Sequence, residues 1–260
     1  MICFSLLAHE NEKAVLDQVE NIHRFIGKNN CMIVVYNGGT DEKFGRKVCD
    51  KHDNVKLCPY SRKLEYRRIG RVLYDVMRWL EKKKAAYDFL MYFEFDTMFI
   101  KHGFKEYLNK RMVGYDWIGQ NLKKLHPLVD SPTTARSMFQ DWDRWQPFFE
   151  QDYFYKTSNP FQTYRSEIVR KMLKIIDGKK LELLLASSTA ECLGEMIYPT
   201  LAAKCGARLR RYDEHFSKFN RFKPALSIKE IQSAVQKDGI MFVHPVKDDH
   251  VREWMMANIK

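Results

Sequence analysis

The sequence predicts an α/β protein in which a mostly parallel central sheet is flanked by helices. Two observations lead to this class. Continuous apolar runs of strand length occur at residues 2–8, 31–37 and 87–94. Amphipathic patterns with helical spacing separate these runs, at residues 11–26 and 68–83. Strands that alternate with such helices form right-handed βαβ units, whose strands run parallel.

The elements of the first hundred residues each have a clear signal. The run at residues 2–8 (ICFSLLA) is uninterrupted, which is typical of a buried strand. The helix that follows carries four apolar residues on one face: Val15, Val19, Ile22 and Ile26. The run at residues 31–37 is closed by Gly38 and Gly39, a turn signal, and residues 54–60 are expected to form a weaker strand.

The second half of the chain is less regular. We expect helices at residues 103–112, 167–176, 190–206 and 248–259, and strands at residues 115–120, 160–166 and 239–247. Residues 122–153 are rich in Trp and Phe but lack clean periodicity, which predicts a long functional loop. No internal repeat or linker divides the sequence, so we expect a single domain over residues 1–260.

The composition is that of a globular protein with a sizeable core: 260 residues, 45% hydrophobic and 30% charged. A net charge of +11 favours anionic partners such as nucleic acid, an acidic membrane surface or a phosphorylated small molecule. No apolar run is long enough to span a bilayer, and the first ten residues lack the basic region of a signal peptide. The six cysteines show no metal-like spacing, which predicts reduced thiols in a soluble, cytoplasmic protein.

Two acidic residues interrupt the apolar segment at residues 89–104. Glu94 and Asp96 come at the end of an expected parallel strand, where ligands of such sheets bind. On an extended chain, side chains two residues apart point the same way, so both carboxylates would face one ligand. Hard oxygen ligands suit Mg²⁺ or Mn²⁺, and such a pair can hold the ion on a diphosphate. The alternative is a turn or a helix cap, but unpaired charge buried there would cost several kcal/mol.

This acidic stretch resembles that of a known family. Residues 89–100 (FLMYFEFDTMFI) are similar to the DxD region of GT-A glycosyltransferases, with Glu94 in place of the first Asp. Four further segments resemble, in order, the opening strand and helix, the second strand, the acceptor-side helix and a late segment that supplies a metal-binding His: residues 4–22, 31–39, 194–209 and 242–247. The resemblance covers nearly the whole chain, and the segments occur in the same order as in the family. The layout is also distantly similar to that of core-2/I-branching transferases.

The resemblance implies a GT-A fold with a nucleotide-sugar-binding half at residues 1–100 and an acceptor-binding half at residues 101–260. It implies transfer of a hexose from a nucleotide-diphospho-sugar, UDP-linked, to a glycan or another hydroxyl acceptor, as in polysaccharide biosynthesis. The donor would meet the loop after the first strand, the end of the second strand, a basic segment and the acidic motif: Ala8, His9, Glu10, Asn37, Gly38, Arg67, Arg71, Glu94, Phe95 and Asp96.

The resemblance further implies Mn²⁺ or Mg²⁺ as the cofactor. Asp96 would bind the ion directly, and Glu94 and His244 would be further ligands. Some members of the family use no metal and neutralise the diphosphate with a basic side chain. Residues 67–71 (RRIGR) offer this alternative.

The acceptor side of the family suggests the catalytic base. In an inverting enzyme Glu195 would take the proton of the acceptor hydroxyl, and Glu191, one turn earlier on the expected helix, is the alternative. In a retaining enzyme the same carboxylate would bind the acceptor or stabilise the oxocarbenium-like state. Trp142 and Trp145 could belong to the core, but their interleaving with polar residues favours stacking on the acceptor sugar.

Two other classes of function stay open. A metal-dependent nucleotidyl or phosphoryl transferase also places acids at strand ends, but residues 36–40 (YNGGT) lack the spacing of a phosphate-binding loop. A basic nucleic-acid-binding protein would suit the charge, but no helix-turn-helix, RNP or zinc pattern supports it. We therefore expect a nucleotide-sugar and a glycan as partners, with no nucleic acid and no transmembrane segment. Peripheral contact with a membrane is compatible with the charge.

Overall fold

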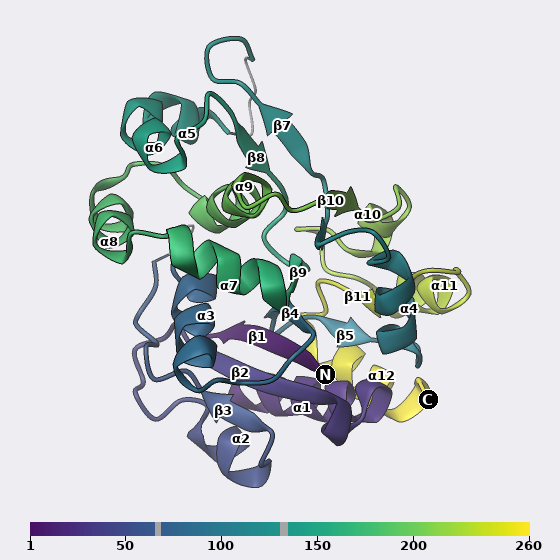
Figure 1. Ribbon diagram of the computed structural model, residues 1–260. Coiled ribbons are helices and arrows are strands. Elements are labelled where there is room, and N and C mark those ends of the chain that lie inside the picture. The colour runs from purple at the N-terminus through teal and green to yellow at the C-terminus, as the bar shows by residue number, and fades with distance from the viewer. Residues whose placement is uncertain (66–68, 131–134) are drawn as a thin grey trace.

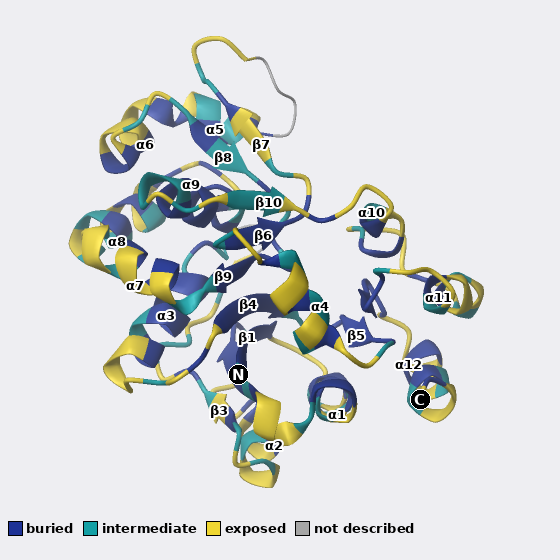
Figure 2. Cartoon of the chain, turned by 45° about the vertical axis from the view of Figure 1, so that its right-hand side comes forward, coloured by how far each residue is buried: buried dark blue, intermediate teal, exposed yellow. Residues whose placement is uncertain are grey.

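A computed structural model of the chain describes residues 1–65, 69–130 and 135–260. Seven strands form the central sheet in the order β10-β6-β9-β4-β1-β2-β3 (Figure 1; β6 is labelled in Figure 2). These strands are β1 (Ile2–Ala8), β2 (Cys31–Asn37), β3 (Val55–Leu57), β4 (Phe89–Glu94), β6 (Trp117–Gly119), β9 (Thr163–Arg165) and β10 (Leu209–Arg211). Strand β9 runs antiparallel to β4 and β6, and the other pairings in this sheet are parallel. The predicted α/β class with a mostly parallel sheet is confirmed.

The central strand β1 is covered on both faces. Phe4 and Leu6 point into one hydrophobic core, and Cys3 and Leu7 point into the other, because successive side chains of a strand alternate. Helix α1 (Glu12–Ile26) contributes to the first core and helix α3 (Val72–Lys82) to the second. This burial on both faces explains why the apolar run at the N-terminus is continuous.

The other helices surround this sheet and two small ones. They are α2 (Arg46–Lys51), α4 (Phe104–Arg111), α5 (Arg136–Gln140), α6 (Trp142–Phe149), α7 (Ser166–Ile175), α8 (Gly178–Ser187), α9 (Ile197–Lys204), α10 (Phe216–Phe219), α11 (Ile228–Val235) and α12 (Asp249–Asn258), with 3-10 turns η1 (Lys28–Asn30) and η2 (Leu193–Glu195). Antiparallel pairs join β5 (Met98–Phe99) to β11 (Phe242–Val243) and β7 (Lys123–Leu125) to β8 (Phe154–Lys156). Figure 2 shows buried central strands and exposed outer faces on helices such as α8 and α11. Within the described residues, no helix combines the length and apolar character needed to cross a membrane.

Two expectations for the second half are wrong. Residues 122–153 are not an irregular loop, since their described part contains β7, α5 and α6. The helix expected at residues 190–206 begins only at Ile197, after the separate turn η2. Pro199 then lies in the first helical turn, where backbone N–H groups have no partner within the helix.

Candidate active site

The two acids lie where β4 ends and the chain turns into β5. Glu94 is the last residue of β4, and Asp96 lies in the turn that follows. A hydrogen bond of 3.1 Å from the N–H of Thr97 to the carbonyl oxygen of Glu94 closes this turn. The two side chains therefore converge through a tight turn and not along an extended strand, as the sequence had suggested. Their place at the carboxyl edge of the parallel strands is as expected.

A third side chain, that of His244, meets the two acids from the segment after β11. Its Nε2 lies 3.2 Å from Oδ1 of Asp96 and 3.4 Å from Oε2 of Glu94. One ligand atom from each of the three residues lies within 4.8 Å of the others. The N–H of Val246 donates to the carbonyl oxygen of Asp96 at 2.7 Å, which holds this segment against the acidic turn. The structure thus brings together the three residues predicted to bind metal.

His244 pairs with both carboxylates. Asp96 and His244 are each only 4% exposed. Burial lowers the pKa of His244, but pairing with Asp96 and Glu94 outweighs this effect and raises the pKa to about 9. Burial raises the pKa of Asp96, and the opposing effect of His244 leaves that pKa below its ordinary value. When no metal is bound, the imidazolium is therefore the counter-charge of the two carboxylates.

The donor set fits a divalent cation. Among the described residues, no donor meets Oδ1 of Asp96 in hydrogen-bond geometry, although this oxygen is buried. The Nδ1 of His244 also lacks a hydrogen-bond partner there, while Nε2 faces the carboxylates. Two carboxylates with one imidazole suit Mn²⁺, and carboxylates suit Mg²⁺. A doubly charged ion at this point would replace the single positive charge of His244.

Glu195 lies on η2, beside this cluster. Its Oε2 is 3.0 Å from Nζ of Lys156, and the two side chains are 19% and 18% exposed. Burial raises the pKa of Glu195, Lys156 opposes the rise, and the charge of Glu94 adds to it. Asn159 contacts both acids: its backbone N–H donates to Glu195, and its Nδ2 donates to Oε1 of Glu94 at 3.4 Å. Glu195 is therefore a buried acid with a raised pKa next to the acidic turn, unlike an exposed glutamate.

Glu191 lies before η2, and its residue is exposed. Its backbone N–H donates to Oγ of Ser137 at 3.1 Å. The expectation that Glu191 and Glu195 lie one turn apart on one helix is wrong, because α9 begins only after both. Burial beside the cluster distinguishes Glu195 from Glu191.

The predicted donor-binding residues at the ends of β1 and β2 lie next to each other. The N–H of Gly38 donates to the carbonyl oxygen of Ala8 at 2.8 Å. The side chain of Asn37 shapes the turn: its Oδ1 accepts from the N–H of Gly39 at 2.9 Å, and its Nδ2 donates to the carbonyl oxygen of Asp41 at 2.7 Å. Both polar atoms of Asn37 are thus used within the turn.

The loop after β1 reaches from this turn to the acidic motif. His9 and Glu10 are exposed, with Nε2 of His9 at 3.6 Å from Oε1 of Glu10. The ring of His9 meets the ring of Phe95 edge-on, with 5.8 Å between the ring centres. Phe95 lies between Glu94 and Asp96, so this contact places the loop after β1 beside the acidic turn.

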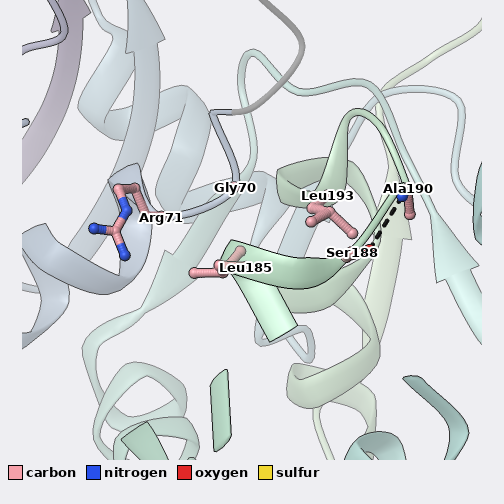
Figure 3. A pocket seen from close by; sticks show the side chains of 6 residues that line it. All are labelled: Gly70, Arg71, Leu185, Ser188, Ala190 and Leu193. Atoms are coloured by element: carbon pink, nitrogen blue, oxygen red, sulfur yellow. Dashed lines mark hydrogen bonds between the residues drawn. The ribbon is translucent and has the colours of Figure 1, made fainter. Parts of the chain in front are cut away.

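Arg71, at the start of α3, is engaged with an acid of α8. Its guanidinium forms an ion pair with Glu182, and its side chain is only 12% exposed. Figure 3 shows the guanidinium pointing away from Leu193 and Ala190, which line a cavity of about 40 Å³ together with Arg71 and its neighbours. This pairing leaves less of its charge for a diphosphate. Arg67 and Arg68, the other predicted phosphate contacts, lie outside the described residues.

Trp142 and Trp145 lie in a hydrophobic core. Trp145 is fully buried, and its Nε1 donates to Oγ of Ser188 at 2.9 Å. Trp142 is 7% exposed and packs against Phe149 and Phe154. The aromatic spacing reflects the inward face of α6, since residues three and four apart share one side of a helix. Their burial contradicts the predicted sugar-stacking role.

The structure places further polar residues at the candidate site that were not predicted from the sequence. Lys156 and Asn159 contact Glu195 as described above. Lys247 is exposed, and its positive charge acts on Asp96 together with that of His244. Lys247 could have been identified from the sequence, since it comes three residues after His244. No local sequence pattern indicates Lys156 or Asn159.

The arrangement of strands and helices matches a GT-A glycosyltransferase fold, as the resemblance implied. Among solved structures, the chain is similar to the galactosyltransferase LgtC in complex with donor and acceptor sugar analogues. The identity is 10% and the TM-score 0.51, over 100% of this chain and 94% of that chain. An active-site mutant of LgtC matches with 11% identity and a TM-score of 0.49, over 95% and 88%. No family model and no curated protein sequence matches the chain. Likeness at this level of identity establishes the fold alone.

Proposed function

We propose that the protein is a metal-assisted glycosyltransferase that moves a hexose from a nucleotide-diphospho-sugar to a hydroxyl acceptor. The observation that carries this proposal is the convergence of Glu94, Asp96 and His244 at the carboxyl edge of a GT-A fold. Two carboxylates and an imidazole at such an edge suit a cation that also binds phosphate oxygens. We take UDP-hexose as the donor and a glycan, as in polysaccharide biosynthesis, as the acceptor.

Glu94, Asp96 and His244 would hold the ion. Mn²⁺ suits the mixed oxygen and nitrogen set better than Mg²⁺, since imidazole is a softer ligand than carboxylate. The ion would supply Lewis-acid stabilisation of the charge on the diphosphate leaving group. Lys247, which is exposed and whose charge acts on Asp96, would share that charge. The nucleotide would meet the adjoining ends of β1 and β2, including His9.

In the transfer step, the bond between the anomeric carbon and the diphosphate oxygen breaks, and the nucleoside diphosphate leaves with the electron pair. The acceptor oxygen bonds to the same carbon and loses its proton. In an inverting reaction Glu195 accepts this proton, since burial has raised its pKa and Lys156 holds its carboxylate in place. In a retaining reaction Glu195 would bind the acceptor or stabilise the oxocarbenium-like state instead, and the departing diphosphate oxygen would take the proton of the acceptor hydroxyl.

The test combines thermal shift with a hydrolysis screen of nucleotide-sugars. UDP should raise the unfolding temperature in the presence of Mn²⁺ but not in its absence, and UDP-sugars should be hydrolysed slowly when no acceptor is present. The Asp96→Asn variant is the control and should show neither effect. Stabilisation by ATP with release of phosphate would favour the phosphoryl-transfer class, and stabilisation by a DNA oligomer alone would favour a nucleic-acid-binding protein.

A further inference from the structure

The turn that carries Glu94 and Asp96 has each of its backbone carbonyl groups bound. The carbonyl oxygen of Asp96 accepts the N–H of Val246 at 2.7 Å. The carbonyl oxygens of Glu94, Phe95 and Thr97 accept side-chain donors that reach the turn from its buried side. These donors come from α1 and α12, which lie next to each other in Figure 1 although they are far apart in the sequence.

Gln18 of α1 binds two of these carbonyl groups. Its Nε2 donates to the oxygen of Glu94 at 2.6 Å and to the oxygen of Thr97 at 2.9 Å. These residues are the first and last of the turn, so one amide group joins its two ends. The side chain is fully buried, and no solvent is available to replace it.

Arg252 of α12 binds the carbonyl group between them. Its Nη2 donates to the oxygen of Phe95 at 2.9 Å, and its Nη1 donates to the oxygen of Ala14 at 3.3 Å. The whole residue is buried, and its guanidinium carbon lies 5.9 Å from the centre of the Phe95 ring. Arg252 therefore fixes the residue that separates the two acids.

We propose that Gln18 and Arg252 are positioning residues that set the metal affinity of the Glu94–Asp96 turn without contacting the ion. This inference rests on the proposed metal site. The two carboxylates can be no better placed than the backbone that carries them, and buried carbonyl groups that lose their donors would force that backbone to rearrange. Residues that orient metal ligands from outside commonly contribute roughly 10- to 100-fold to affinity.

Asn21 provides a matched control on the same helix. It is buried, and its amide exchanges two hydrogen bonds with the backbone of Phe99, at 3.0 and 2.7 Å. It holds β5 and not the acidic turn. Gln18→Met and Asn21→Leu each remove two buried hydrogen bonds and approximately preserve volume. Both should lower the unfolding temperature, but only Gln18→Met should weaken metal binding.

Two substitutions separate the charge of Arg252 from its hydrogen bonds. Arg252→Lys keeps the positive charge but loses the planar arrangement of donors, and Arg252→Met loses both. If Arg252 acted through its charge alone, Arg252→Lys would leave the metal affinity unchanged and Arg252→Met would raise it, since a nearby cation opposes metal binding. If Arg252 is a positioning residue, both variants should bind the metal more weakly than the wild-type protein does.

The experiment is calorimetric titration of the full chain with Mn²⁺ alone, well below the unfolding temperature of every variant. We expect Gln18→Met and Arg252→Lys to bind roughly 10- to 100-fold more weakly than wild type, and Asn21→Leu to bind as wild type does. Unchanged affinity in Gln18→Met, or an equal loss in Asn21→Leu, overturns the inference. If the Gln18→Met variant does not fold, the Mn²⁺ affinity of the Arg252→Lys variant tests the inference instead, and an unchanged affinity overturns it.

The same titration distinguishes failure of the inference from failure of the proposed function. A wild-type protein that binds no Mn²⁺, or an Asp96→Asn variant that binds as wild type does, overturns the metal site and the inference with it. The positioning role alone is overturned if the wild-type protein binds Mn²⁺, the Asp96→Asn variant does not, and the Gln18→Met variant binds it as tightly as wild type.

Discussion

His244 should make the stability of the metal-free protein depend on pH within a defined window. Its pKa is about 9 in the folded protein against an ordinary value of 6.5. A basic group whose pKa is raised by folding stabilises the protein fully below the unfolded value, and this contribution is lost as the pH rises through the folded value. The stabilisation should therefore be complete below pH 6.5 and disappear through about pH 9.

The size of the effect follows from the shift. One pKa unit corresponds to about 1.4 kcal/mol, so protonation of His244, with burial and pairing combined, contributes on the order of 3 kcal/mol to the free energy of unfolding. The imidazole is almost completely buried between Asp96 and Glu94, so solvent screening reduces this little. In a chain of this length, such a change would lower the unfolding temperature by roughly 6–12 °C.

The assay is urea unfolding of the wild-type protein and the His244→Gln variant in a chelator, across the same pH window. Taking the difference between the two proteins removes the contribution of other groups, such as the buried thiol of Cys58, whose pKa burial raises to about 11. The advantage of wild type in unfolding free energy should shrink by about 3 kcal/mol across the window. Parallel loss of stability in the two proteins would refute a charged His244 between the carboxylates.

Three further outcomes are expected. Asp96→Asn should abolish stabilisation by UDP with Mn²⁺ while circular dichroism stays unchanged; a normal thermal shift would contradict its role as a ligand. Glu195→Gln should lower turnover by roughly 10² to 10⁴ without changing donor affinity, and Glu191→Gln should stay active; the reverse ranking in steady-state kinetics would move the base to Glu191. Mn²⁺ should raise the unfolding temperature more near pH 9 than near pH 6.5, because binding requires that His244 lose its proton; equal shifts would argue against this ligand.

The strands and the acid pair could be predicted because their signals are local, whereas His244 was selected only through the resemblance to the family. Burial on both faces leaves an uninterrupted apolar run in β1, and an acid pair that interrupts such a run in β4 is conspicuous. The geometry of the turn at Asp96 could not be predicted, because it depends on donors that distant helices supply. The burial of Trp145 could not be predicted either. Its spacing in the sequence is compatible with a core residue or with a sugar-binding surface, and it is buried because Ser188 and other distant residues cover it.

A usable signal for the supporting residues was present in the helices. Gln18 lies three residues after Val15 and four before Ile22, so a polar side chain stands on the apolar face of α1. Arg252 stands three residues before Met255 on the inward face of α12. A polar residue at such a position needs a buried partner. The sequence showed that a partner was required but not that it would be the backbone beside the acids.

The ligands of the proposed metal come from two segments of the chain, one with Glu94 and Asp96 and the other with His244. A bound ion would act as a cross-link that closes a loop of about 150 residues, the kind of loop whose closure removes much entropy from the unfolded chain. The ion would thus tie the C-terminal segment to the central sheet as well as serve catalysis. Release of the ion above about pH 9, where His244 no longer carries the proton that pairs it with the acids, should therefore loosen the segment from His244 to Arg252 before the sheet itself is disturbed.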